Sequence, residues 1–526
     1  MKRAAAALVL RTICRVVARS AAPGLVPLAL SLASGCGPAE PPAKVASETA
    51  PAPAGAPGTA GPIDAILGAW EADLEHNGQR GRFALEFARR DDGTVIARIS
   101  IPAIDVWSMP AWPVTMEGNE VRMGGTTLTF HAEAGRLAGV MPDDLVPVHR
   151  IPLELRRVGS IERPAEDRVT LPARQPLWTF PTGGPIWAGV TYADGIVFTG
   201  SDDGLIYAID ARSGKESWRF ASEGAIRARP ILDGRYLLAH SDDGYLFRLD
   251  ARDGSVDWRV RLGPPLQRAA YGDDGYRYDG YASAAAVGDG LVYISHTEGR
   301  LLAIDASTGE ERWNFKAQDQ IVSTPLARDG RVYVGSFDGR IRAIDAASGT
   351  LLWEHATGAA VPSSAAWHEG KVIIGSRSYD LLALHAGDGS VAWNHYYWFS
   401  WIESTAVVRD GIAYIGASDS QLLNAIDAGT GRLVWSFDTG GSAWAEPAVG
   451  DGAVYIGAAG VADYMVDHRG GFYAVDRESG RGLWRFPAER SGAEKLWGFT
   501  SSPAAGDGMV FVGGLDGRLY AFSTSG

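Results

Sequence analysis

Residues 208–218 read AIDARSGKESW, and this eleven-residue pattern decides the fold. It returns as AIDASTGEERW at 303–313, AIDAASGTLLW at 343–353, AIDAGTGRLVW at 425–435 and AVDRESGRGLW at 474–484. Two copies depart: RLDARDGSVDW at 248–258 has arginine for the first alanine, and ALHAGDGSVAW at 383–393 has histidine for the aspartate. In-phase copies of one pattern indicate a structural repeat, which determines the architecture before any finer assignment.

The pattern has a direct physical interpretation. An apolar strand ends at the aspartate, a turn follows in which glycine supplies a positive φ, and the next strand carries the tryptophan. Asp-Gly pairs between apolar runs, as at 194–195, 329–330 and 507–508, indicate further hairpins in the same units. Each unit is therefore predicted to be a four-stranded blade that needs neighbouring blades to bury its faces.

The spacing of the tryptophans gives the number of blades. From Trp218 to Trp484 the intervals are 40, 55, 40, 40, 42 and 49 residues, and Trp178 lies 40 residues before Trp218. The last unit ends at 521–523 without a tryptophan, so we expect the strand at Trp178 to complete that blade and close the ring. The predicted fold class is all-β, with an eight-bladed β-propeller over 176–526. The tryptophans assigned to docking between blades are Trp178, Trp218, Trp258, Trp313, Trp353, Trp393, Trp435 and Trp484.

The motif A-x-D-x-x-[ST]-G-x-x-x-W resembles the tryptophan-docking motif of the PQQ-like, or quinoprotein-like, β-propeller repeat family. The resemblance covers residues 176–523. That family includes the pyrroloquinoline-quinone (PQQ) alcohol dehydrogenases and the BamB-type lipoprotein of the outer-membrane β-barrel assembly machinery. The resemblance implies the fold more strongly than the function, because one fold carries many functions.

The N-terminus has the features of an export signal. Residues 1–35 contain five basic and no acidic residues and an apolar stretch at 21–33, followed by Cys36. The stretch resembles a bacterial lipoprotein signal, which implies lipidation of Cys36 and an outer-membrane protein at the periplasmic face, in contact with the membrane through the lipid only. A plain secretory signal or an uncleaved anchor remains the alternative. Residues 36–63 are rich in proline and alanine and are predicted to be a linker.

A small β domain is predicted over 64–158, followed by a second linker over 159–175. Phe83, Leu85 and Phe87 keep the period of two that is typical of a half-buried strand. About eight such strands fit, which indicates a small antiparallel barrel or sandwich. The opening at 68–70, Gly-Ala-Trp, resembles the start of lipocalin-type barrels, although we expect a filled core.

Composition excludes several classes of protein. The formal net charge is −13 and no basic stripe occurs, which argues against a nucleic-acid partner. The two cysteines, Cys14 and Cys36, both lie near the N-terminus, so the body of the protein has no thiolate metal site. The PQQ enzymes hold their cofactor on the propeller axis beneath a disulfide of adjacent cysteines, with a calcium ion and an acidic base. No adjacent cysteine pair or calcium-ligand motif occurs here, so we expect no cofactor and no metal, with PQQ and calcium as the alternative.

The innermost strands predict a candidate site on the axis. One column is small in every unit, as at Ala188 and Ser323, because blades crowd near the axis. The positions on either side of this column vary, and their large or charged members all belong to units that become neighbours when the ring closes. This candidate channel pocket consists of Trp187, Arg227, Arg229, Glu403, Trp444 and Glu446. The competing interpretation is that Arg–Glu pairs plug the channel.

Aromatic residues gather in the long connections that fall at one end of the propeller. Tyrosine and tryptophan on loops of one face suit a protein interface. The candidate binding face consists of Tyr271, Tyr276, Tyr278, Tyr281, Tyr396, Tyr397, Trp398, Trp401, Tyr464 and Trp497. The alternative is that these aromatics form a lid over the channel.

The sequence therefore predicts a monomeric, non-enzymatic scaffold in the bacterial envelope that binds another envelope protein, such as a barrel-assembly component. Two alternatives stay open: a PQQ-dependent dehydrogenase, and a periplasmic sensor that binds a small molecule or a glycan.

Overall fold

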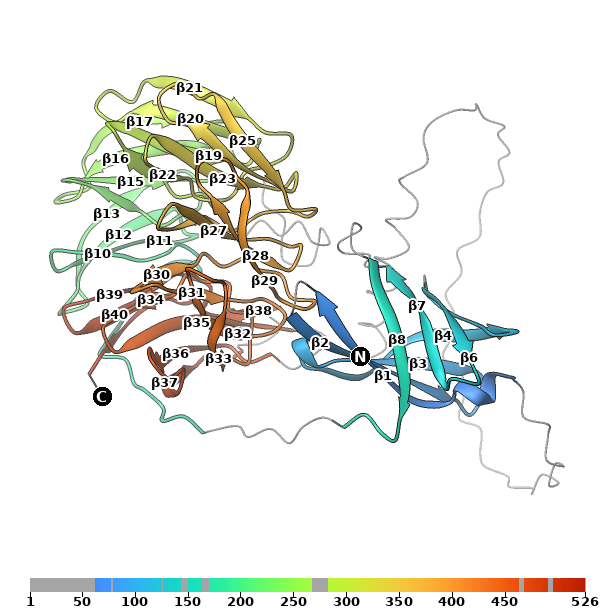
Figure 1. Cartoon of the computed structure of the whole chain (residues 1–526). Coiled ribbons are helices and arrows are strands. Elements are labelled where there is room, and N and C mark those ends of the chain that lie inside the picture. The colour runs from blue at the N-terminus through green and yellow to red at the C-terminus, as the bar shows by residue number, and fades with distance from the viewer. Residues whose placement is uncertain are drawn as a thin grey trace, which may run out of the picture.

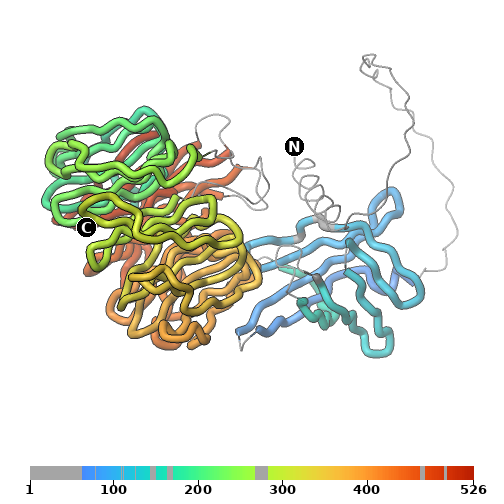
Figure 2. The backbone as a smooth tube through the Cα atoms, turned by 90° about the horizontal axis from the view of Figure 1, so that it is seen from above, coloured from blue at the N-terminus to red at the C-terminus, as the bar shows by residue number. Residues whose placement is uncertain are grey.

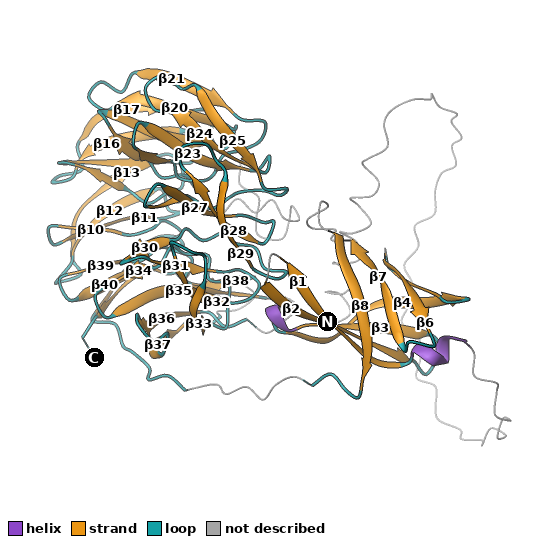
Figure 3. Cartoon of the chain, in the orientation of Figure 1, coloured by secondary structure: helices purple, strands orange, loops and turns teal. Residues whose placement is uncertain are grey.

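The computed structural model describes residues 62–76, 79–124, 126–142, 150–162, 170–266, 282–462, 468–490 and 495–525. The predicted signal over 1–35 and Cys36 lie outside these residues. The described chain forms a small barrel beside a larger propeller (Figure 1). Helix in this part of the chain is confined to two short 3₁₀ turns, η1 (Pro62–Ile66) and η2 (Pro102–Ile104) (Figure 3).

The N-terminal domain is a closed antiparallel barrel of the strands β1 to β8 in sequence order, so the barrel alternative is the correct one. Its strands are β1 (Gly68–His76), β2 (Gln79–Arg89), β3 (Val95–Ile101), β4 (Val106–Glu117), β5 (Glu120–Met123), β6 (Thr126–His131), β7 (Arg136–Pro142) and β8 (Arg150–Val158). The predicted period of two in β2 places Phe83, Leu85 and Phe87 in the barrel core. Trp70 is fully buried there, donates to the carbonyl of Ile66 at 2.7 Å and lies under the Arg157 guanidinium at 4.6 Å.

The propeller consists of four-stranded antiparallel sheets arranged as blades. Blade one consists of β10 (Thr191–Ala193), β11 (Ile196–Gly200), β12 (Leu205–Asp210) and β13 (Glu216–Ala221), and blade two of β14 (Ile231–Asp233), β15 (Tyr236–His240), β16 (Tyr245–Asp250) and β17 (Val256–Arg261). Blade three consists of β18 (Ala286–Gly288), β19 (Leu291–His296), β20 (Arg300–Asp305) and β21 (Glu311–Lys316), and blade four of β22 (Leu326–Arg328), β23 (Arg331–Ser336), β24 (Arg340–Asp345) and β25 (Leu351–Ala356). Blade five consists of β26 (Ala366–His368), β27 (Lys371–Gly375), β28 (Asp380–His385) and β29 (Val391–Tyr396), and blade six of β30 (Val407–Arg409), β31 (Ile412–Gly416), β32 (Leu422–Asp427) and β33 (Leu433–Asp438). Blade seven consists of β34 (Ala448–Val449), β35 (Ala453–Val461), β36 (Gly471–Asp476) and β37 (Gly482–Pro487), and a short strand, β38 (Leu496–Gly498), also pairs with β35.

The eighth blade joins the two ends of the propeller, as predicted. Its strands are β39 (Ala504–Gly506), β40 (Met509–Gly513), β41 (Arg518–Ser523) and, from the N-terminal side, β9 (Trp178–Pro181). Trp178 lies opposite Ala521 in the β9–β41 register. The prediction of closure by the N-terminal strand is therefore confirmed, and the ring has no unpaired seam between its first and last blades.

The repeated tryptophans connect consecutive blades. In the described part of the chain, seven of the eight indoles donate to the backbone carbonyl that follows the motif aspartate, or its histidine replacement, in the next blade, at 2.9–3.1 Å. The motif glycine of that next blade has a positive φ, as at Gly349 (74°), and an added Cβ there would lie 2.7 Å from the Trp313 ring. The glycine is thus required both for the turn and for the approach of the neighbouring indole.

The barrel contacts the propeller at the outer strand of blade five (Figures 1 and 2). The side-chain amide of Gln79 donates to the carbonyl of Asn394 at 3.2 Å and accepts from the backbone N–H of Tyr396 at 2.9 Å. Gln79 therefore makes the two hydrogen bonds that a further strand would make to the edge of β29. Beside it, the His76 ring lies 4.2 Å from the Tyr396 ring, and a Cβ on Gly81 would lie 2.5 Å from the Trp398 indole.

No helix among the described residues is long and apolar enough to cross a membrane.

Candidate functional site: a cavity on the propeller axis

All six residues of the candidate channel pocket line one cavity of about 310 Å³. They lie on the segments that precede the innermost strands, directly before or after the small column. That column is buried, as at Ala188 and Ser323, so its neighbours are the side chains that border the axial space. Apolar and hydroxyl side chains of the other blades complete the lining, among them Val322, Pro362 and Thr405.

One ion pair crosses the cavity. Arg229 of blade two reaches Glu446 of blade seven, with an Nη1–Oε1 distance of 3.0 Å. The side chain passes over blade one at Gly189, where a Cβ would lie 2.6 Å from the Arg229 Nε atom. Gly189 therefore permits the crossing, and the Arg–Glu pairing considered from the sequence is present without filling the cavity.

The remaining charged lining residues pair with the turn between the second and third strands of the preceding blade. The Arg227 guanidinium donates to both carboxylate oxygens of Asp202, at 2.7 and 2.8 Å. Glu403 accepts from Arg377 at 2.6 Å, and both of these side chains are buried.

The indoles of the lining are also held by their neighbours. Trp444 donates from Nε1 to the Ser418 hydroxyl at 2.9 Å. Ser418 lies in the turn between the second and third strands of blade six, which is equivalent to the turns that hold Asp202 and Arg377 in blades one and five. The Trp187 ring lies 5.4 Å from the Arg227 guanidinium.

Sequence reasoning missed these partners. A signal existed, because each partner lies 25 or 26 residues before the lining residue that it binds.

Hydroxyl groups link neighbouring blades around the same cavity. In the column after the small residues, backbone N–H groups donate to hydroxyl oxygens of the next blade: Ala284 to Thr324 at 3.0 Å, Thr324 to Ser364 at 2.8 Å, Ser364 to Thr405 at 3.3 Å and Glu446 to Ser502 at 3.2 Å. A hydroxyl that accepts one such bond keeps its own O–H as a donor. This hydroxyl arc was not predicted, although its Ser and Thr residues occupy one column of the sequence.

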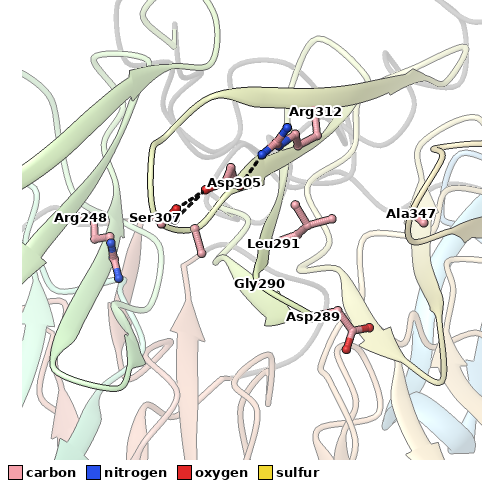
Figure 4. A pocket seen from close by; sticks show the side chains of 9 residues that line it. Arg248, Asp289, Gly290, Leu291, Asp305, Ser307, Arg312 and Ala347 are labelled. Carbon is pink, nitrogen blue, oxygen red and sulfur yellow. Dashed lines mark hydrogen bonds and ion pairs between the residues drawn. The ribbon is translucent and has the colours of Figure 1, made fainter.

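A larger hollow of about 690 Å³ lies at the turns of blades two to four (Figure 4). Its charged groups belong to the repeat motif: Asp305 accepts from the Arg312 guanidinium at 2.7 Å and from the Ser307 hydroxyl at 2.6 Å. The bond from Arg312, with that from Ser307, holds the pKa of Asp305 well below its ordinary value. Because the same aspartate-centred turn recurs in other blades, this hollow reflects the structural repeat, and the axial cavity is the better candidate site.

Comparison with known proteins decides the family. The family model described as "Outer membrane protein assembly factor BamB" matches residues 167–273, 276–397 and 398–526, which is more than half of the chain. The chain belongs to this BamB family of PQQ-like repeat propellers.

Individual relatives are more distant. The quinoprotein alcohol dehydrogenase PedE of Pseudomonas putida is 43% identical over 67 residues, which span 11% of each protein. The solved quinohemoprotein alcohol dehydrogenase of Comamonas testosteroni has a TM-score of 0.50 at 14% identity, over 67% of this chain and 76% of that one. Sqt1 of Saccharomyces cerevisiae has a TM-score of 0.52 at 14% identity, over 67% of this chain and all of Sqt1. At these identities the two structures support the propeller fold alone.

The axial cavity does not fit the calcium ion that the quinoprotein resemblance implies beside PQQ. No group of three or more His, Cys, Asp or Glu side chains within the described ranges is placed to hold a metal ion. The two acidic groups of the cavity, Glu403 and Glu446, are each bound to an arginine. A calcium ion would have to displace these arginines, so the residues present do not supply the acidic calcium site that the quinoprotein resemblance implies.

The described residues of the candidate binding face are used within the chain. Tyr396 and Tyr397 are buried, Trp398 packs against the barrel, and burial raises the pKa of the Tyr397 phenol. Trp401 lies 4.5 Å from the Arg377 guanidinium, and the Trp497 ring covers Gly460. Tyr271, Tyr276, Tyr278, Tyr281 and Tyr464 lie outside the described residues.

Proposed function

We propose that this BamB-family propeller is a non-enzymatic scaffold, anchored in the bacterial envelope through a lipid on Cys36, that binds another envelope protein. The observation that carries the proposal is the family match over 167–526, to proteins described as outer-membrane assembly factors. The axial cavity supports a non-catalytic role, because both of its carboxylates are bound to arginines.

The proposed partner-binding face is the end of the propeller that carries the long connections. The barrel already covers part of this face, at Tyr396 and Trp398. Glu223, in the connection that leads into blade two at the same end, is exposed. The proposed partner is a component of the outer-membrane barrel-assembly machinery.

Site-specific photocrosslinking in intact cells tests this proposal. A photoreactive amino acid at Glu223 should crosslink to one envelope protein, which mass spectrometry identifies, whereas the same group at Arg212 should not. Arg212 is a suitable control because it is also exposed and lies in a motif turn at the opposite end of blade one. Crosslinks from Arg212 alone would place the partner on the wrong face, and the absence of a crosslink from every position on the proposed face would refute the scaffold role.

A further inference from the structure

The axial cavity combines three features that together describe a ligand. Its charged lining residues are two arginines and two glutamates, so their charges cancel. Each one is already in an ion pair: Arg229 with Glu446, Arg227 with Asp202, and Glu403 with Arg377. An anion would have to compete with a carboxylate for its arginine, and a cation would have to compete with an arginine for its carboxylate. The cavity therefore favours a neutral occupant.

The second feature is a set of hydroxyl donors. Thr324, Ser364, Thr405 and Ser502 line the cavity and accept backbone N–H groups, yet no described residue accepts a hydrogen bond from their O–H groups. Thr500 also lines the cavity, and its buried hydroxyl has no hydrogen-bond partner in the described protein. The four residues of the arc are half-buried, so water in the cavity supplies acceptors for their O–H groups, and an oxygen-rich ligand would replace that water.

The third feature is a pair of indoles from blades one and seven, the blades on either side of the one that carries Thr500 and Ser502. Trp444 is held by its bond to Ser418, and Trp187 lies against Arg227, so both rings are fixed before any ligand arrives. An indole face attracts the C–H groups of a saturated ring through its quadrupole. Rings that are fixed in advance lose little entropy on binding.

We propose that the axial cavity binds a neutral, polyhydroxylated ligand the size of one sugar ring, whose apolar face stacks on Trp187 or Trp444 and whose hydroxyl oxygens accept from the hydroxyl arc. The volume of about 310 Å³ corresponds to about ten water molecules and lies at the small end of ligand pockets. The ligand is either a free monosaccharide or the terminal unit of a glycan. This site is independent of the proposed partner-binding face.

Calorimetric titration of the full chain tests the site. The probes are glucose, N-acetylglucosamine, their trisaccharide oligomers, and two charged controls, glucuronate and PQQ with calcium. We expect a neutral sugar to bind and the charged probes to bind more weakly. Equal affinity for monosaccharide and trisaccharide would identify a free sugar, and tighter binding of the trisaccharide would identify a glycan end. Tighter binding of glucuronate or PQQ, or binding of none of the probes, would overturn the proposal.

Two variants locate the binding at the cavity. Trp444→Ala should weaken sugar binding about tenfold, whereas Trp107→Ala should not; Trp107 is an indole of the barrel domain that is likewise bonded to a side chain, Asp105, at 2.8 Å. Thr500→Val keeps the shape of the residue and removes only the hydroxyl, so it should weaken binding about fivefold without lowering stability. Its control is Thr179→Val on the exposed side of β9. Unchanged sugar affinity in both cavity variants would refute the site.

Discussion

The closure of the ring can be tested quantitatively at Trp178, the docking indole of the closing strand β9. Trp178 donates to the carbonyl of Ala211 at 2.9 Å, and Ala211 is fully buried. Replacing a fully buried tryptophan by alanine costs about 3–5 kcal/mol. Because Trp178 is partly exposed, we expect Trp178→Ala to lower the free energy of unfolding by about 2–3 kcal/mol, of which about 1 kcal/mol is the lost hydrogen bond. Trp178→Phe keeps most of the packing and should cost about 1–2 kcal/mol.

Urea denaturation followed by tryptophan fluorescence measures these differences, and hydrogen exchange locates them. The control is Leu177→Ala, since Leu177 precedes Trp178 and its side chain is 57% exposed; it should change stability by less than about 0.5 kcal/mol. Amides of β41 should lose protection first in Trp178→Ala, because β41 pairs with β9. If Trp178→Ala unfolds at the same urea concentration as the parent and β41 keeps its protection, closure through β9 does not stabilise the propeller.

Three further predictions concern the anchor, the docking of the barrel and the response to acid. Cys36→Ser should move the protein from the membrane fraction to the soluble periplasmic fraction, and unchanged partitioning would exclude lipid anchoring through this residue. Gly81→Ala should release the barrel, because its Cβ would displace the Trp398 ring; small-angle scattering should then show a larger radius of gyration, which Gly159→Ala, with no neighbour within 4 Å, should not cause. Burial lowers the pKa of His395 below 6.5, so the unfolded chain binds the proton first and stability should fall as the pH drops below 6.5. His395→Gln should reduce that slope, and an identical pH dependence would show that His395 is not its source.

The ring could be predicted from the sequence because the residues that build it carry a local signal. The docking tryptophan, the turn glycine and the aspartate lie within eleven residues of one another, and the glycine needs its positive φ in every copy. Trp178 could be assigned to the last blade because that unit lacked a tryptophan. The axial residues were also predictable, since an eight-fold ring places equivalent positions of each repeat around one axis.

The contacts between distant segments could not be predicted in the same way. Gln79 carries no motif, and only the structure shows that its amide binds the edge of β29. Tyr396 and Trp398 were identified as aromatic loop residues suited to an interface. The sequence did not indicate that the domain they contact belongs to the same chain, because an internal and an external interface use the same residue types.

The structure separates what holds the ring from what lines its axis. The docking indoles and turn glycines lie at the outer strands and connect every pair of consecutive blades described above except the seventh and eighth, where Trp484 instead packs against Phe522 at 5.5 Å. The inner positions differ from blade to blade: blades three to five carry Ala282, Val322 and Pro362 where others carry charged or aromatic residues.

Blades with such small or apolar residues close the ring as well as blades one, two, six and seven do, so the ion pairs and indoles of the axis are not required by the fold. The Arg229–Glu446 pair is partly exposed, and such pairs contribute only about 0–1 kcal/mol to stability. Replacing Arg229 and Glu446 together by leucine should therefore change the stability of the propeller in urea by no more than about 1 kcal/mol. A large loss of stability in this double variant would instead assign the pair to the fold.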